Sequence, residues 1–125
     1  MLSFPSKKSF LIKSQRMKGT HLGEFEELVL LTVAVLYDNA YGVAVQQEIK
    51  ERSGRSVTIS TVHAALKRLE QKGYARSEYG KATPQRGGRR KLLFQVTIAG
   101  KSALENSKTL RNNLWNDISA RAFVS

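Results

Sequence analysis

The spacing of apolar residues changes at Gly73, and this change limits the folds open to the chain. Before Gly73, apolar residues recur at intervals of three and four, which is typical of amphipathic helices. The clearest set of this kind is Val62, Ala65, Leu66 and Leu69. After Gly73 the apolar residues alternate with a period of two, as in β-strands. The sequence therefore predicts several helices followed by a small sheet.

Three helices are expected before Gly73, over residues 24–37, 43–52 and 61–72. The first is almost uniformly apolar from Leu28 to Leu36, which predicts burial on most sides. Ser60 is expected to cap the third helix, and Gly73 is expected to end it in a left-handed conformation. The β-branched residues 57–59, between the second and third helices, predict a minimal strand or an extended loop.

Two strands are expected after Gly73, over residues 74–79 and 92–97. They would form a hairpin whose long connecting loop is rich in glycine and basic residues. Leu92, Phe94 and Val96 would share one face of the second strand. The predicted fold is therefore mainly α with a small β-hairpin.

A final helix is expected over residues 98–123. Its apolar residues form a thin stripe with Trp115 at one edge: Leu104, Leu110, Leu114 and Ile118. Little else in the chain is left to cover this stripe. The pattern predicts a helix that pairs with a second copy, so that these five residues form the interface of a homodimer.

Charge is distributed unevenly along the chain. The 21 Lys and Arg residues outnumber the 10 Asp and Glu residues, giving a net charge of +11. Residues 80–101 carry six basic residues and no acidic one, whereas residues 24–79 are nearly neutral. A protein this basic favours polyanionic partners.

Several classes of function are disfavoured by what the sequence lacks. It has no Cys, which excludes disulfide scaffolds and thiol catalysis. Its two histidines stand far apart, without carboxylates at metal-ligand spacing, so neither a metal site nor a cofactor is expected. No nucleophile–base pair or phosphate-binding motif is present either, and we expect no enzymatic activity.

The order of helices, hairpin and basic loop is that of a winged helix-turn-helix domain followed by a C-terminal dimerisation helix. In such domains the third helix enters the major groove of DNA, while the loop of the hairpin reaches phosphates. The residues expected to contact DNA from the third helix are Ser60, Thr61, His63, Ala64, Lys67 and Arg68. Those expected from the loop are Lys81, Arg86, Gly87, Gly88, Arg89, Arg90 and Lys91.

Each of these features also has an ordinary explanation. A Lys-Arg pair on a helix is usually part of a solvated face, and a single residue such as His63 usually has no role beyond lying at the surface. A glycine pair such as Gly87-Gly88 usually serves only to form the turn. Their combination favours binding to double-stranded DNA. The alternative is a winged-helix module that binds protein or RNA instead of operator DNA.

Several ordered motifs carry a family resemblance: His21–Glu26, Leu28–Leu31, Ala40–Gly42, Thr61–Glu70, Lys72–Tyr74, Pro84, Arg86–Lys91 and Val96–Lys101. Together they resemble the PadR-type transcriptional regulators over about residues 21–118. The resemblance implies a bacterial or archaeal cytoplasmic homodimer that binds a pseudo-palindromic operator, most often as a repressor. The sequence departs from the family pattern at His63, where the family usually has Tyr, at Leu93-Phe94, where it has an aromatic pair, and at Ile98, where it has Pro.

Trp115 has two interpretations within this resemblance. Some relatives bind flat aromatic molecules between their two subunits, and Trp115 would stack such an effector at the dimer interface. The simpler interpretation, which we favour, is that Trp115 packs against the second copy.

The sequence divides into three segments. Residues 1–20 are expected to be a disordered basic arm, or a start assigned too early if Met17 is the initiator. Residues 21–97 form the predicted DNA-binding domain, and residues 98–123 form the dimerisation helix. No stretch is long and apolar enough to span a membrane or act as a secretory signal. The cytoplasmic location is what the family resemblance implies.

Overall fold

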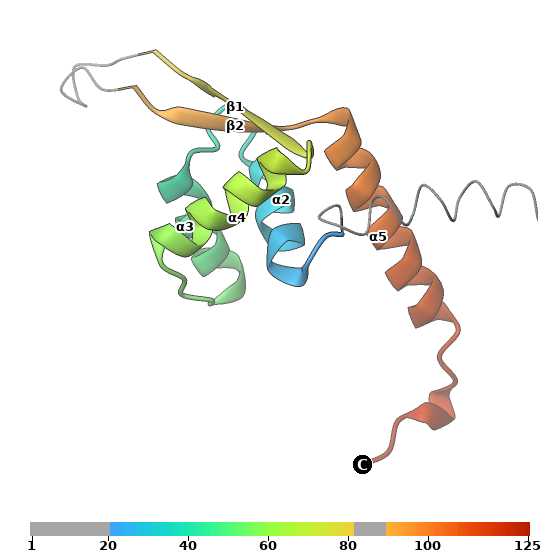
Figure 1. The fold of residues 1–125 in the computed structure, drawn as a ribbon. Helices are drawn as coiled ribbons and strands as arrows, with labels where there is room; N and C mark the ends of the chain where they lie inside the picture. Colours follow the sequence, from blue (N-terminus) through green and yellow to red (C-terminus); the bar gives the residue numbers. More distant parts are fainter. Residues whose placement is uncertain (1–20, 82–89) are drawn as a thin grey trace, which may run out of the picture.

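The computed structural model describes residues 21–81 and 90–125, and its elements follow the predicted order (Figure 1). The helices and strands are α2 (Glu24–Val35), α3 (Gly42–Ser53), α4 (Ile59–Gln71), β1 (Ala75–Tyr79), β2 (Leu92–Val96), α5 (Ile98–Asn116) and the short 3-10 helix η2 (Ala120–Ala122). The prediction of a winged helix-turn-helix fold, mainly α with a small hairpin, is confirmed. The predicted N-terminal arm lies outside the described residues.

The core lies between α2, α3 and α4. The predicted stripe of α4 is buried in full: Val62, Ala65, Leu66 and Leu69 have no exposed surface. Val45 and Ile49 of α3 meet this stripe, as their four-residue spacing predicts. Removing each of the larger side chains, those of Val, Leu and Ile, from water contributes about 1.5–3 kcal/mol to folding.

The hairpin closes the core from one side. Its strands are antiparallel, with Ala75 opposite Val96 and Tyr79 opposite Leu92. Of the three residues predicted to share a face of β2, only Phe94 is buried. The backbone N–H of Phe94 donates to the carbonyl of Ala40 at 2.8 Å, which ties the hairpin to the connection between α2 and α3.

The start of α4 differs from the prediction. Thr58, not Ser60, is its N-cap, and the Thr58 hydroxyl oxygen accepts from the backbone N–H of Thr61 at 3.1 Å. Ile59 is already helical, so residues 57–59 do not form a strand. Either hydroxyl suits a cap, and the difference arises because Thr58 keeps the extended backbone that a cap requires. The predicted end of the helix is confirmed, since Gly73 adopts a φ of 80°.

The prediction that α2 is buried on most sides is wrong. Val29, Leu30 and Val33 face the core, but Leu31 and Val35 are about half exposed. An apolar run shows that a helix needs cover, and it does not show whether that cover comes from its own chain.

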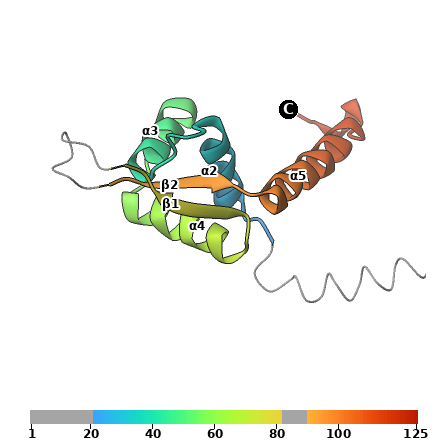
Figure 2. The same ribbon diagram turned by 90° about the horizontal axis from the view of Figure 1, so that it is seen from above.

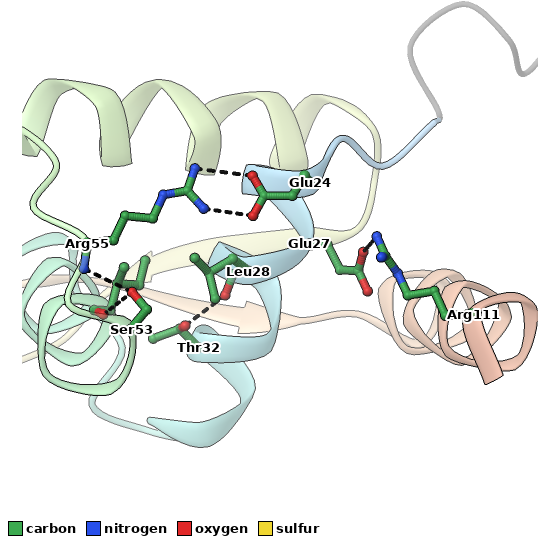
Figure 3. Close-up of polar contacts among 8 residues, drawn as sticks. Glu24, Glu27, Leu28, Thr32, Ser53, Arg55 and Arg111 are labelled. Atoms are coloured by element: carbon green, nitrogen blue, oxygen red, sulfur yellow. Dashed lines mark hydrogen bonds and ion pairs between the residues drawn. The ribbon is translucent and has the colours of Figure 1, made fainter. Parts of the chain in front are cut away.

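The acidic first turn of α2 holds two other elements in place (Figure 3). Glu24 accepts two hydrogen bonds from the guanidinium of Arg55, at 2.7 and 3.1 Å, in the turn before α4. Glu27 accepts one from Arg111 of α5 at 2.9 Å. At the beginning of a helix, such carboxylates are also favoured by the helix dipole.

Helix α5 is anchored at its beginning and leaves the body of the domain toward its end (Figures 1 and 2). Gly100 packs so closely that an added Cβ would collide with the carbonyl oxygen of Tyr74. One turn later, Leu104 packs against the core. The helix ends at Asn116 and not at residue 123, so Ile118 lies beyond it. No helix within the described ranges is long and apolar enough to cross a lipid bilayer.

Candidate nucleic-acid interface

One face of α4 points away from the core and carries all the residues predicted to contact DNA from this helix. Ser60, Thr61, His63, Ala64, Lys67 and Arg68 are all exposed. This arrangement follows from the helical period, because the four buried positions occupy the opposite face. The face presents short polar side chains at its beginning and basic side chains further along.

The hydroxyl groups at the beginning of α4 are linked to one another. The Thr58 and Thr61 hydroxyl oxygens are 2.8 Å apart, and the Ser60 hydroxyl lies 3.3 Å from that of Thr58. Each hydroxyl both donates and accepts, so the cluster holds its side chains in place while leaving them exposed.

His63 lies back toward α3. A Cβ added at Gly42 would collide with the imidazole ring of His63, at both Nε2 and Cδ2. The ring therefore occupies the space that any side chain at Gly42 would need. This contact gives His63 a packing role that its exposed position in the sequence pattern did not indicate.

Arg68 is held by an ion pair. Its Nε donates to Glu26 of α2 at 2.7 Å, and Lys72 Nζ donates to the same carboxylate at 2.6 Å. The backbone N–H of Gly23 supplies a third hydrogen bond at 3.0 Å. Only 7% of the Glu26 side chain is exposed. Burial alone would raise the pKa of Glu26, but the hydrogen bonds from Lys72, Gly23 and Arg68 lower it to about 2.

The network around Glu26 was not predicted from sequence. Glu26 stands among other acidic residues, and its basic partners follow more than forty positions later. The only available signal was the four-residue spacing of Arg68 and Lys72, which places both on one side of α4.

The loop between the strands is described only at its two ends. Of the predicted contact residues, Lys81, Arg90 and Lys91 are described, while Arg86, Gly87, Gly88 and Arg89 lie outside the described residues. The Lys91 ammonium lies 4.0 Å from the centre of the Tyr41 ring, and the Arg90 guanidinium lies 5.1 Å from that of Tyr79. Cation–π contacts thus position both basic side chains at the base of the hairpin.

A cleft brings α4 and the base of the hairpin together. Its volume is about 460 Å³. The residues that line this α4–hairpin cleft are Tyr41, Gly42, Val43, His63, Lys67, Glu70, Arg90, Lys91, Leu92 and Phe94. Four of them were predicted to contact DNA, from two segments more than twenty residues apart. Tyr41, Val43 and Leu92 were not predicted, because no local pattern shows that they face the same cleft.

The residues predicted for the dimer interface fall into two groups. Leu110, Leu114 and Trp115 are 60%, 62% and 69% exposed, respectively. Leu104 instead packs partly against the core of its own chain. Ile118 follows the end of α5 and does not continue the helical stripe.

Metal-ligating residues do not gather in the described part of the chain. Between residues 21 and 81, and from residue 90 onward, no three Asp, Glu or His side chains lie close enough to hold an ion.

The sequence matches a known family over most of this fold. The family model described as "Transcriptional regulator PadR-like family" matches residues 30–106, which is more than half of the chain. No curated protein sequence matches it significantly.

Several solved structures are similar to this one. A PadR-like transcription factor from Bacteroides fragilis is 26% identical, with a TM-score of 0.61, and the match covers 86% of this chain and 98% of that chain. A PadR family transcription regulator from Clostridium difficile R20291 is 29% identical, with a TM-score of 0.58, over 74% of this chain and 92% of that one. Bacillus subtilis PadR, in complex with operator DNA, is 19% identical with a TM-score of 0.57, over 70% and 48% of the two chains.

Proposed function

We propose that this chain, which belongs to the PadR-like family of transcriptional regulators, binds a pseudo-palindromic operator as a homodimer and represses transcription. One observation carries the proposal most directly. The exposed face of α4 lines the same cleft as Arg90 and Lys91, which directly precede the second strand of the hairpin. A single DNA duplex can therefore contact both. The B. subtilis relative, whose structure includes operator DNA, has the same fold.

In this proposal α4 enters the major groove. Thr61, Ala64 and Lys67 lie on its exposed face, where base edges would be read. Arg90 and Lys91 contact the phosphate backbone, together with Arg86 and Arg89, which lie outside the described residues. Arg68 contributes less than the sequence indicated, because its Nε is already engaged by Glu26.

The homodimer is proposed from the uncovered apolar surface. Leu110, Leu114 and Trp115 on the second half of α5 are largely exposed, and Leu31 and Val35 of α2 are about half exposed. A second copy that covers these residues would remove them from water, which is the main driving force for such association. Trp115 would then pack within the interface, the interpretation favoured by its apolar neighbours. Residues 21–97 would bind DNA and α5 would join the two copies.

A gel-shift experiment tests this function. The DNA upstream of the chain's own gene serves as the duplex, competed separately with unrelated duplex and with RNA. We expect a complex of two chains per duplex, competed poorly by unrelated DNA and by RNA. If RNA competes as well as the specific duplex, the chain is the RNA-binding module of the alternative interpretation. A complex with one chain per duplex would contradict the homodimer.

A further inference from the structure

Helix α5 is fixed to the body of the domain at its beginning. The backbone N–H of Thr97, its N-cap, donates to the carbonyl of Tyr74 at 3.0 Å. The Thr97 hydroxyl donates to the carbonyl of Gly73 at 2.6 Å. Gly100 packs so closely on Tyr74 that no side chain would fit there. The first turn of α5 therefore has no room to slide, and the helix can change its direction only by turning about residues 97–100.

Beyond its first two turns, α5 separates from α2. Every residue from 108 onward is exposed, and Figure 2 shows α5 pointing away from the other helices. A groove of about 260 Å³ lies between α2 and α5. Its lining residues are Glu27, Leu31, Leu104, Glu105, Lys108, Arg111 and Asn112. The second half of α5 therefore has little packing within its own chain to hold its direction.

An ion pair crosses this groove. Arg111 Nη2 donates to Glu27 Oε1 at 2.9 Å (Figure 3). Only 15% of the Glu27 side chain is exposed, so the carboxylate has a fixed place and the guanidinium reaches it from α5. No other salt bridge joins α5 to the part of the chain that the structure describes. Arg111 is thus the charged residue that ties the second half of α5 to the domain.

The turn of α2 that carries Glu27 is also bound to the DNA-facing part of the domain. Glu24 is held by Arg55, in the turn before α4. Glu26 is held by two basic side chains of α4 itself. With the core packed between them, α2 and α4 behave as one body, and Glu27 belongs to it. The contact of Arg111 with Glu27 therefore links the direction of α5 to that of α4.

We propose that the ion pair between Arg111 and Glu27 sets the angle between α5 and α4, and thereby the spacing of the two operator half-sites. From Gly100 to its end at Asn116, α5 extends about 24 Å. A turn of about 8° moves that end by about 3.3 Å, which is close to the rise of one base pair. Arg111 is then a specificity-determining residue that acts without touching DNA. The effect on spacing rests on the proposed function, whereas the fixed angle of α5 does not.

Distances within one chain test the angle without DNA. The chain has no Cys, so Gln47→Cys on α3 and Asn113→Cys on α5 provide two unique sites for spin labels, both exposed. Labelled chain is diluted into an excess of unlabelled chain, so that pulsed electron paramagnetic resonance reports distances within single chains. We expect a narrow distance distribution, which Arg111→Gln broadens. An unchanged distribution would overturn the proposal.

Lys108→Gln is the matched control. Lys108 is exposed and lines the same groove, but it forms no ion pair with any residue that the structure describes. This variant should keep the narrow distribution. Glu27→Gln should broaden it as much as Arg111→Gln does, and the double variant should broaden it no further, because both substitutions remove the same contact. A double variant broader than either single one would mean that the two side chains act independently, contrary to the proposal.

Duplexes with altered half-site spacing test the consequence for the operator. Fluorescence anisotropy measures binding to the operator and to versions with one base pair added or removed between the half-sites. Arg111→Gln should reduce the preference for the native spacing by roughly twofold to fivefold, the range of an exposed ion pair, because a helix free to turn accommodates the shift. Binding to a single half-site should not change.

Two other outcomes separate the proposals. An equal loss on all duplexes, including the single half-site, would assign Arg111 a direct contact with DNA and overturn its role in spacing. If the chain binds no duplex at all, the proposed function fails, while the label distances still decide whether the ion pair holds α5.

Discussion

The imidazole ring of His63 lies against the Cα of Gly42, where the first turn of α3 passes the exposed face of α4. This contact joins two helices at the position where the PadR-type pattern usually has Tyr. His63 therefore packs against the first turn of α3 in addition to any contact it makes with DNA. The contact between His63 and Gly42 should therefore affect the stability of the fold.

Gly42→Ala should destabilise the fold even though alanine favours helices by about 1 kcal/mol. The added methyl group collides with the His63 ring, and such overpacking costs about 1–3 kcal/mol. His63→Ala alone should change stability little, and the double substitution should recover most of the loss. Urea denaturation of the four proteins measures this coupling. Equal losses in the single Gly42→Ala and the double variant would show that the ring is not what fills the space.

Glu26→Gln should destabilise the fold by about 2–4 kcal/mol, because Lys72 is largely buried and would lose its anionic partner. This loss is smaller than the cost of breaking a fully buried ion pair, because Arg68 is half exposed and remains solvated. Arg111→Ala is the comparison, since its bond to Glu27 lies at the surface and should contribute at most about 1 kcal/mol. Thermal or urea unfolding distinguishes the two values. Similar losses in both variants would mean that the Glu26 network is no stronger than a surface pair.

The same carboxylate predicts a pH dependence. The pKa of Glu26 is lowered from 4.5 to about 2, so the folded state holds this group ionised more strongly than the unfolded chain does. Its contribution is therefore complete above pH 4.5 and is lost as the pH falls toward 2. Urea unfolding between pH 6 and pH 2 should show a loss of about 1–3 kcal/mol from this group. Glu26→Gln should flatten that part of the curve, and an unchanged slope would assign the acid sensitivity to other groups.

What the sequence predicted correctly depends on local periodicity. The buried face of α4, the left-handed Gly73 and the order of helices and strands each follow from residues within a few positions of one another. The exposed positions of α4 follow from the same period, and six of the predicted DNA-contacting residues lie there.

What it missed depends on tertiary contacts. Glu26 meets Arg68 and Lys72 only because α2 packs against α4, and Tyr41 meets Lys91 only after the hairpin packs against α2 and α4. The end of α5 was placed too late because Ala and Phe near residue 120 continue an apolar pattern that the backbone does not follow. The exposed side of α2 needs cover from another element, and a run of apolar letters does not identify its source.

The proposed dimer interface predicts the effect of charge on α5. Leu110→Asp with Leu114→Asp places two carboxylates in the proposed apolar seam, where burial of an unpaired charge costs several kcal/mol. Both side chains are exposed within a single chain, so the isolated fold should keep its helical content. Sedimentation should show monomers, while circular dichroism stays unchanged. An intact dimer in this variant would place the interface elsewhere.

Proposed contacts to phosphates and to bases predict different losses on DNA binding. Arg89→Ala and Arg90→Ala should each weaken binding to all sequences similarly, and reduce the slope of log affinity against log salt by about one. Thr61→Ala should instead relax sequence preference by about 1–3 kcal/mol and leave non-specific affinity nearly unchanged. Fluorescence anisotropy on one operator and one scrambled duplex, at several salt concentrations, measures both effects.

Because a dimer reads two half-sites about one helical turn apart, moving them by half a turn should abolish tight binding. If the arginine variants lose specificity and Thr61→Ala loses only general affinity, then the hairpin reads the bases and α4 holds the backbone.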